Sequence, residues 1–283
     1  MTWDADKGLE LARLDAAAIA ARQEELLRRH VRYCAEHSPF YRNMFRQTGV
    51  APGEIVTLAD LARLPLTEKR HLEECRDEFL AVGEDQVTDV CLTSGTTGKP
   101  IAMLQNNADL ERLAYNEEIS FRGVGITSAD RVLVAAAIDR CFMAGLAYFM
   151  GLTRIGATVI RGGSSSTALL VELIRNCRPS AIIGVPTLLL ALARKLEQEG
   201  LTPDAVGVTR LICIGEPVRT PDFALSPLGE RLSQAWGCRI FGTYASTEMA
   251  TSFTDCDAGL GGHLHPDLVA VEIVDAEGRP VPD

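Results

Sequence analysis

Hydrophobic and polar positions follow two different rhythms along this chain. From about residue 8 to residue 80, apolar residues recur at helical spacing. The residues that share one face of the first long helical segment are Ile19, Leu26, Leu27, Val31 and Cys34. Ser38-Pro39 ends this segment, because the residue before a proline avoids helical backbone, and a short second helix is expected over 41–47. The first rhythm therefore predicts a helical N-terminal region, which we place at 1–85.

After residue 86 the rhythm changes to short β-branched runs separated by segments of helix length. The runs expected to form strands are 90–92, 132–138, 157–161, 181–185, 210–214, 239–241 and 269–274. The segments expected to form helices are 107–121, 144–154, 168–176, 187–199 and 222–236. Strands that alternate with helices imply parallel βαβ units, so the predicted fold class is α/β with a doubly wound, mainly parallel sheet over 86–283.

Several polar residues predict where elements begin and turn. Thr57 and Thr67 are expected to start helices, and Thr57 has Asp60 at capping-box spacing. The segment 275–280 reads as a tight turn after the last expected strand. No GxGxxG sequence follows a strand, so the pattern gives no support to a dinucleotide-binding fold.

Composition and charge narrow the class of protein. The 283 residues have a net charge of −10, which argues against nucleic acid or a membrane surface as partner, since both favour a basic footprint. No long uncharged apolar run and no signal-peptide pattern is present, so we expect a soluble, cytoplasmic protein. The eight cysteines are scattered without any CxxC spacing, and reduced thiols are expected rather than disulfides.

The segment with the clearest chemistry is Thr93-Ser94-Gly95-Thr96-Thr97-Gly98-Lys99-Pro100. Its glycines allow close backbone approach, while its hydroxyls, backbone N–H groups and Lys99 can bind the oxygens of a polyphosphate such as ATP. It is not a Walker A loop, because Thr93 and Pro100 stand where that motif needs glycine and a Ser or Thr. A plain surface turn is the less favoured alternative.

A second motif, Thr243-Tyr244-Ala245-Ser246-Thr247-Glu248, follows the expected strand 239–241. Ligands in open α/β sheets bind beyond the carboxyl ends of strands. Glu248 is the natural Mg²⁺ ligand there, because Mg²⁺ prefers carboxylate and phosphate oxygens. The alternative interpretation is a capped helix start with Glu248 in its first turn.

A third motif, Cys213-Ile214-Gly215-Glu216-Pro217, follows another expected strand. Gly215 allows the backbone to approach a planar ring, and Glu216 offers an acceptor to an amino or ribose group. The alternative is a left-handed turn with a solvated glutamate. Thr187, in the similar segment 184–187, has a competing interpretation as the cap of the next helix.

Together these motifs resemble the phenylacetate-CoA ligase-like branch of the adenylate-forming enzymes. That branch has a phosphate loop, a Gly-Glu-Pro segment, a Tyr-Gly-x-Ser/Thr-Glu segment, an acidic-Cys pair, a His and a Glu-Ile-x-Asp strand. The matching segments occur here in the same order as 93–100, Gly215-Glu216-Pro217, Tyr244 to Glu248, Asp255-Cys256, His263 and Glu272-Ile273-Val274-Asp275. The N-terminal segments 38–41 and 64–69 are also similar to the opening of that branch, so the resemblance spans the whole chain.

The resemblance implies an AMP-forming acyl-CoA ligase that activates a small carboxylic acid, aryl or arylacetic, with ATP and Mg²⁺ and transfers it to CoA. It implies catalytic roles for Lys99, Thr247 and Glu248, with Glu248 as the Mg²⁺ ligand. The residues it assigns to the nucleotide are Ser94, Gly95, Thr96, Thr97, Gly98, Lys99, Gly215, Glu216, Pro217, Thr243, Tyr244 and Thr247. It also implies that 140–145 walls the acyl pocket, where Phe142 and Met143 favour an apolar acid.

Two departures from the branch leave alternatives open. Ala245 replaces the usual glycine, and the family pattern continues past Asp283 into a ribose-binding segment and a mobile C-terminal lid that carries an assisting lysine. We therefore expect a chain without this lid. The alternative function is a lidless protein that binds nucleotide or acyl-adenylate with little turnover; a kinase or ATPase that releases ADP is a third reading. A separately supplied lid domain and a homodimer also stay open.

Cys256, His263 and His265 form a C-x6-H-x-H pattern of side chains that suit zinc. The spacing is not that of a standard zinc finger, and only three ligands are visible. A zinc site is therefore the less favoured interpretation beside a polar loop that lines the acyl pocket.

Overall fold

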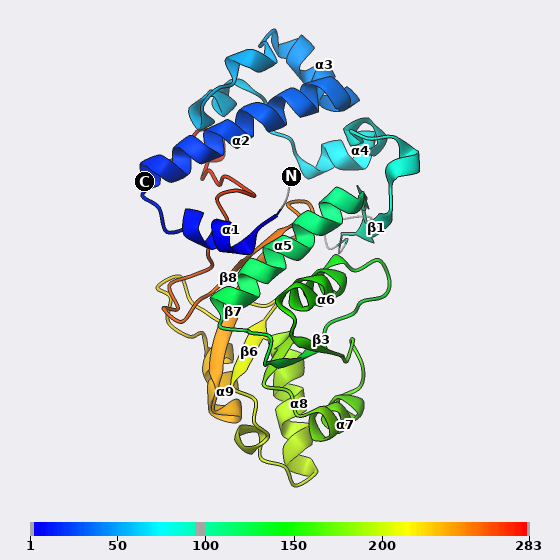
Figure 1. Cartoon of the computed structure of the whole chain (residues 1–283), viewed down its shortest axis with the longest axis vertical. Coiled ribbons are helices and arrows are strands. Elements are labelled where there is room, and N and C mark those ends of the chain that lie inside the picture. The colour runs from blue at the N-terminus through cyan, green and yellow to red at the C-terminus, as the bar shows by residue number, and fades with distance from the viewer. Residues whose placement is uncertain (1–2, 94, 96–99, 282–283) are drawn as a thin grey trace. The chain divides into compact units, whose positions relative to one another are not determined.

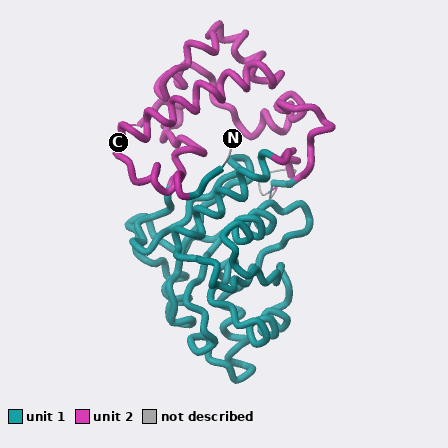
Figure 2. The backbone as a smooth tube through the Cα atoms, viewed as in Figure 1, with its two compact units in different colours: residues 1–5, 91–93, 108–263 teal, residues 6–90, 94–107, 264–283 magenta. Residues whose placement is uncertain are grey.

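The computed structural model describes residues 3–93, 95 and 100–281, and the chain divides into two compact units. Unit 1 comprises residues 1–5, 91–93 and 108–263, and unit 2 comprises residues 6–90, 94–107 and 264–283 (Figure 2). Each unit is thus built from segments that are far apart in the sequence. The predicted boundary at 85/86 stays a prediction, because compactness alone does not test which part folds independently.

The core of unit 1 is a six-stranded sheet in the order β4-β3-β5-β6-β7-β8 (Figure 1). Its strands are β3 (Arg131–Ala135), β4 (Thr158–Arg161), β5 (Ala181–Gly184), β6 (Arg210–Cys213), β7 (Arg239–Ser246) and β8 (Thr251–Thr254). The pairs from β4 to β7 are parallel and in register, with Leu133 beside Ile182 and Ile182 beside Leu211, whereas β7 and β8 are antiparallel. Every residue of the central strand β5 is buried, as expected for a parallel strand covered on both faces.

Helices cover both faces of this sheet. They are α5 (Asn107–Gly123), α6 (Met143–Ile155), α7 (Thr167–Cys177), α8 (Pro186–Gln198) and α9 (Pro227–Trp236), with a short 3-10 helix at Pro203–Ala205. Apolar side chains of α7, α8 and α9 form one core with Leu133, Ile182 and Leu211. The helix α6 connects β3 to β4 and packs on both strands, whereas α7 connects β4 to β5 and packs on β3. These two parallel connections run in opposite directions along the sheet, so the usual right-handed crossover places α6 and α7 on opposite faces. The predicted doubly wound α/β class is confirmed.

Unit 2 contains the predicted N-terminal helices and one short strand. Its elements are α1 (Ala5–Leu11), α2 (Ala16–His37), α3 (Pro39–Thr48), α4 (Lys69–Phe79), 3-10 helices at Pro52–Glu54, Leu58–Arg63 and Glu84–Gln86, and the strand β2 (Ala102–Gln105). The strand β1 (Asp89–Leu92) begins in unit 2, and its last two residues belong to unit 1. Ser38 separates α2 from α3 as predicted: its N–H donates to the carbonyl of Cys34, and its Oγ accepts from the N–H of Tyr41. Val31, Phe45 and Ile55 form the centre of the helical core.

Some predicted boundaries are wrong for identifiable reasons. Thr67 does not start a helix; α4 begins at Lys69, and the ring Nδ1 of His71 accepts from the N–H of Glu68. The expected strand 269–274 does not form, and Val271 and Ile273 are exposed. Only an isolated bridge joins Val274 to Pro280 around the predicted turn, so among the described residues no neighbouring strand is available to this apolar run.

Two elements of unit 1 are longer or shorter than their patterns predict. The strand β7 extends to Ser246 because the unpredicted strand β8 pairs with its second half. The predicted helix 222–236 begins only at Pro227, after Ser226 caps it and a bridge joins Arg219 to Leu225. In the part of the chain that the structure describes, no helix is both long and apolar enough to cross a bilayer.

Candidate functional site

The predicted motifs of unit 1 meet at the carboxyl edge of its sheet. The parallel strands β5, β6 and β7 run in the same direction, so the segments that follow β5 and β6 lie beside the second half of β7. These segments contain Thr187, Gly215-Glu216-Pro217 and Thr243 to Glu248. Ligands of doubly wound sheets bind at this edge, so the topology brings three sequence-predicted segments to one place.

Glu216 joins two of these segments. Its Oε2 accepts from the backbone N–H of Thr187 at 3.0 Å, and its Oε1 accepts from Thr187 Oγ1 at 2.9 Å. The carboxylate therefore caps the first turn of α8, whose own N-cap residue, Val185, offers no side-chain bond. Gly215 has a φ of +74°, as the left-handed alternative expected, but the glutamate is held by Thr187 rather than solvated.

The third motif forms a β-hairpin rather than a helix start. Thr243 to Ser246 are the end of β7, Thr247–Ala250 form the turn, and β8 returns from Thr251. The interpretation of Glu248 as part of a capped helix is therefore wrong: the paired strand β8, which the pattern did not predict, makes the segment turn back.

The hairpin presents an aromatic ring and a carboxylate. Tyr244 is 66% exposed, and its ring lies nearly parallel to that of Phe253 with centroids 6.1 Å apart. Glu248 is exposed, and its Oε2 accepts from Ser246 Oγ at 2.8 Å. A flat ring beside an accessible carboxylate can stack on a base and hold a cation near phosphate oxygens.

Asp255 holds two segments of this edge together. The sequence indicated it only as part of the Asp255-Cys256 pair and predicted no contact for it. Its Oδ2 accepts from Arg219 Nε at 2.6 Å and from the N–H of Gly242 at 3.1 Å, and the residue is 3% exposed. Arg219 also donates to the carbonyl of Phe223. The buried ion pair thus ties the segment after β6 to β7, a tertiary contact that no local pattern announces.

The glycine-rich loop is described only in part. The N–H of Leu92 donates to the carbonyl of Cys141 at 2.9 Å, so within unit 1 the chain enters this loop beside the segment that follows β3. Gly95 has a φ of +66°, the left-handed conformation that favours glycine, and an added Cβ would lie 3.0 Å from Pro100 Cδ. The predicted phosphate ligands Ser94, Thr96, Thr97, Gly98 and Lys99 lie outside the described residues.

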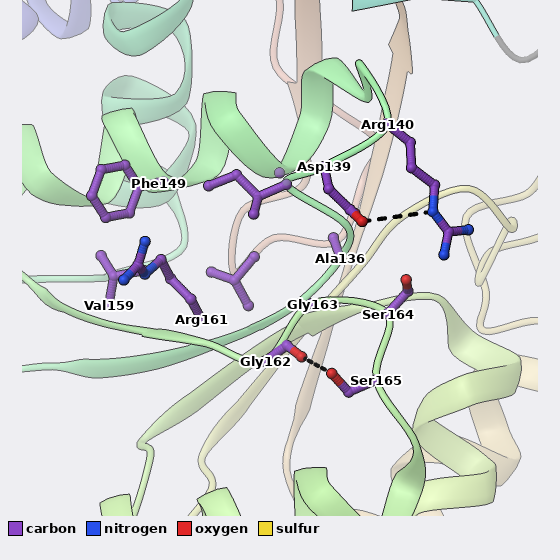
Figure 3. A pocket seen from close by; sticks show the side chains of 13 residues that line it. Ala136, Asp139, Arg140, Phe149, Val159, Arg161, Gly162, Gly163, Ser164 and Ser165 are labelled. Carbon is purple, nitrogen blue, oxygen red and sulfur yellow. Dashed lines mark hydrogen bonds and ion pairs between the residues drawn. The ribbon is translucent and has the colours of Figure 1, made fainter.

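A pocket of about 330 Å³ opens beside the carboxyl ends of β3 and β4 (Figure 3). Phe149 and Val159 line one side, and the other side carries Asp139, Arg140 and the segment 162–165. The guanidinium of Arg161 lies 5.8 Å from the centre of the Phe149 ring. The pocket therefore combines an apolar wall with cationic and hydroxyl groups, and its volume lies in the range of small-molecule sites.

The predicted acyl wall 140–145 contributes to this pocket only at its two ends. Arg140 and Gly145 line it, whereas Phe142 is exposed and Met143 is buried elsewhere. Arg140 and Cys141 both have φ near +57°, at 58° and 56°, which is strained backbone for residues other than glycine. The argument for an apolar acid from Phe142 and Met143 therefore has no support from this pocket.

The donor set for zinc is not assembled. Cys256 Sγ accepts from the N–H of Ala258 at 3.4 Å, and within residues 3–93, 95 and 100–281 no group of three His, Cys, Asp or Glu side chains is arranged to hold a metal ion. Glu248 fits a different chemistry, since Mg²⁺ commonly takes one or two carboxylates and fills its other positions with phosphate oxygens and water.

Comparison with known proteins agrees with this architecture. The family model described as "AMP-binding enzyme" matches residues 28–283. Phenylacetate-coenzyme A ligase of Pseudomonas putida is 33% identical over 72% of this chain and 47% of its own length, and that of Thermus thermophilus is 29% identical over 97% of this chain and 61% of its own length. The chain thus spans about half the length of the curated relatives it matches.

Solved structures give the same fold. A 2-hydroxyisobutyryl-CoA ligase in complex with 2-HIB-AMP and CoA has a TM-score of 0.86 and 27% identity, covering 95% of this chain and 58% of that protein. A benzoate CoA ligase from Burkholderia xenovorans, at 22% identity and a TM-score of 0.52, shows the fold alone over 72% of this chain and 39% of its own. The chain belongs to the AMP-binding enzyme family, among its phenylacetate-CoA ligase-like members.

Proposed function

We propose that this chain is the nucleotide- and acid-binding part of an AMP-forming acyl-CoA ligase. In the first step a carboxylate oxygen of the acid bonds to the α-phosphorus of ATP, and the bond to pyrophosphate breaks. In the second step the sulfur of CoA bonds to the acyl carbon, AMP leaves with its oxygen, and the thiol proton passes to solvent. The observation that carries the proposal is the β7–β8 hairpin, which presents Tyr244 and Glu248 at the carboxyl edge of the sheet.

Each segment of the site is proposed to bind a different part of ATP or Mg²⁺. The backbone and side chains of Ser94 to Lys99 hold the β- and γ-phosphates, Gly215 to Pro217 and Thr243 border the adenine, and Tyr244 stacks near it. Thr247 donates to the α-phosphate. Mg²⁺ held by Glu248 would neutralise phosphate charge as it develops. The exposed carboxylate of Glu248 supports its role, and the hydrogen bond from Ser246 keeps one oxygen fixed.

The acid is proposed to be aryl or arylacetic, because several of the similar ligases are named for phenylacetate and ferulate. The pocket beside the carboxyl ends of β3 and β4 supports a flat acid through Phe149, while Arg161 and the serines of 162–165 would meet a polar substituent. We also propose a cytoplasmic location, since all eight cysteines are free, as expected in a reducing compartment. A separate lid domain and a homodimer belong to the same proposal.

Pyrophosphate exchange tests the function directly. The 283-residue chain is incubated with ATP, Mg²⁺ and a panel of aryl acids, with and without an added lid domain from a phenylacetate-CoA ligase. Acid-dependent exchange and release of AMP are expected. ATP binding without exchange in either condition contradicts the ligase and supports the alternative, a protein that binds nucleotide or acyl-adenylate with little turnover; release of ADP contradicts both.

A matched pair of variants connects the reaction with the proposed residues. Glu248→Gln keeps the size of the side chain and removes its charge, so we expect the Mg²⁺-dependent part of ATP binding to fall by about tenfold, the effect of one charge-assisted contact. Glu230→Gln, an exposed carboxylate in the first turn of α9, is the control and should leave binding unchanged. Equal binding by wild type and Glu248→Gln contradicts the metal role.

A further inference from the structure

Buried polar side chains of α5 lie against the returning strand of the hairpin and have no role in the proposed reaction. Asn116, Glu117 and Ser120 on α5, and Thr251 and Ser252 on β8, are each no more than 3% exposed. Figure 1 shows α5 beside β8. Polar groups are costly to bury unless they are hydrogen-bonded. The hydrogen bonds of this cluster therefore decide how α5 and β8 are held together.

Asn116 bonds to the first two residues of β8 with both ends of its amide. Its Oδ1 accepts from Thr251 Oγ1 and from the N–H of Ser252, the second at 3.3 Å. Its Nδ2 donates to Ser252 Oγ at 2.7 Å and to Glu117 Oε1 at 3.1 Å. The amide thus has two acceptor and two donor contacts, which is its full capacity. A side chain used so completely fixes the strand start in one orientation.

Two further residues of α5, Arg112 and Glu117, bond to the turn and to the start of β8. Arg112 Nη1 donates to the carbonyl of Ala250 at 2.7 Å, and Ser252 Oγ donates to Glu117 Oε1 at 2.9 Å. Ala250 has a φ of +49°, a strained conformation for alanine. Such a conformation persists only where its surroundings hold it, so the bond from Arg112 and the anchored strand start together determine how the turn Thr247–Ala250 closes.

The same hydrogen bonds set the far end of the turn that carries Glu248. Ser246 and Thr251 are paired across the hairpin, so the four turn residues are held between β7 on one side and Asn116 on the other. We propose that Asn116 is a positioning residue for Glu248 and Thr247: by fixing the start of β8 it aims the turn at the nucleotide's phosphates and Mg²⁺, a role that rests on the proposed function and needs no contact with the ligand.

Glu117 indicates that this cluster does more than stabilise the fold. Its Oε2 is buried and has no hydrogen-bond partner among the described residues, and burial raises the pKa of this carboxyl from 4.5 to about 7. A helix built for stability alone would carry an apolar residue here. The carboxyl keeps Ser252 in place through its other oxygen, at the cost of an unpaired atom.

The test compares how much Mg²⁺ strengthens ATP binding in three variants of the 283-residue chain. The measured quantity is the ratio of the Kd for ATP without Mg²⁺ to that with Mg²⁺, from calorimetric titration. Asn116→Ala is expected to lower this ratio by about tenfold, as Glu248→Gln does. Asp130→Asn is the matched control: a buried carboxyl of unit 1 at the amino end of β3, bonded to Ser180 and Arg210, whose loss lowers stability but not the ratio.

Amide hydrogen exchange of residues 244–254 gives a second readout that does not depend on the ligand. We expect these amides to exchange faster in Asn116→Ala than in Asp130→Asn at equal global stability. If Asn116→Ala does not fold, Arg112→Met, which removes the bond to the carbonyl of Ala250, takes its place with the same expectation.

The outcomes separate the two proposals. A ratio and an exchange pattern in Asn116→Ala that match Asp130→Asn overturn the positioning role. A wild-type chain that binds ATP equally with and without Mg²⁺ contradicts the proposed role of Glu248 instead, and faster exchange confined to 244–254 then still supports the contact between Asn116 and the hairpin.

Discussion

At the scale of single residues, the backbone of Ala250 is the clearest case of local strain next to the candidate site. Its φ of +49° costs an L-residue about 1–2 kcal/mol, and glycine escapes this cost. The contacts from α5 supply the energy that holds alanine there. The strained backbone of Ala250 therefore lowers the stability of the fold, and a substitution that removes the strain can measure this cost.

Replacing Ala250 by glycine should relieve the strain. We expect Ala250→Gly to raise the free energy of unfolding by up to about 1 kcal/mol, net of the greater freedom of glycine in the unfolded chain. Urea denaturation measures the change. Ala258→Gly is the control: its φ is not positive, so the same substitution should lower stability there. Destabilisation of similar size at both positions would show that Ala250 is not strained.

Glu117 predicts a dependence of stability on pH. Burial, the largest cause, raises the pKa of Glu117 in the folded state to about 7, although hydrogen bonds from Ser252 and Asn116 lower it. Burial also raises the pKa of the neighbouring Tyr148. Between pH 4.5 and 7 the folded state keeps a proton that the unfolded state has lost, so stability should fall as pH rises through this window, by at most about 3 kcal/mol.

The variant Glu117→Gln checks this dependence, because glutamine keeps the shape of the side chain and cannot ionise. Urea midpoints of wild type and variant are compared at pH 5 and pH 7.5. The wild type should lose stability over this range by about the amount given above, and the variant should lose clearly less. Parallel declines of the two proteins would mean that Glu117 does not titrate in this window.

At the scale of elements, buried runs predicted strands well and polar strands poorly. The strands β3 to β6 lie within a few residues of their predicted bounds, since β-branched residues in a covered parallel sheet leave an unbroken apolar run. The strand β8, with the sequence Thr-Ser-Phe-Thr, has no such run and exists because β7 and Asn116 bond to it. The apolar run 269–274 shows the converse, a strand pattern without a partner.

For the candidate site, the sequence predicted the location of the motifs but not the contacts of their side chains. The motifs at 215–217 and 243–248 were placed at the correct edge, because a residue that follows a parallel strand must lie there. The bonds from Thr187 to Glu216 and from Arg219 to Asp255 join residues 29 and 36 positions apart, and only the completed sheet brings them together. Local patterns therefore locate a site, and tertiary contacts decide how its side chains are used.

The contact between Glu216 and α8 gives a prediction at this scale. Glu216→Ala removes both acceptors of Thr187 and should lower the free energy of unfolding by about 1 kcal/mol, the usual effect of losing a helix cap. Glu216→Gln retains one acceptor and should cost less. Thermal denaturation of the two variants measures the order. Equal losses in the two variants, which both lack the charge, would show that the charge rather than the cap matters.

At the scale of the whole molecule, the eight free cysteines differ in accessibility and give a test of the entire fold. Cys141 is exposed, whereas Cys91 and Cys213 are buried, and burial raises the pKa of the Cys213 thiol and brings that of Cys238 to about 11. Thiolates react with alkylating agents and buried thiols do not. Iodoacetamide at pH 8 should therefore label Cys141 before the others, and Cys213 only after unfolding.

Peptide mass spectrometry after a timed series measures this order, and denatured protein, in which all eight thiols should react alike, is the control. Early labelling of Cys213 in the native protein would contradict the position of β6 inside the sheet.

The division of each unit among distant segments has a consequence for synthesis on the ribosome. Unit 2 needs its last residues: Gln23 Nε2 donates to the carbonyl of Val269, and an added Cβ at Gly278 would meet Leu66. The main segment of unit 1 ends at His263, before those residues are made. Although its helices are translated first, unit 2 is completed last, so the nascent chain must carry an unfinished N-terminal region while the whole sheet of unit 1 emerges.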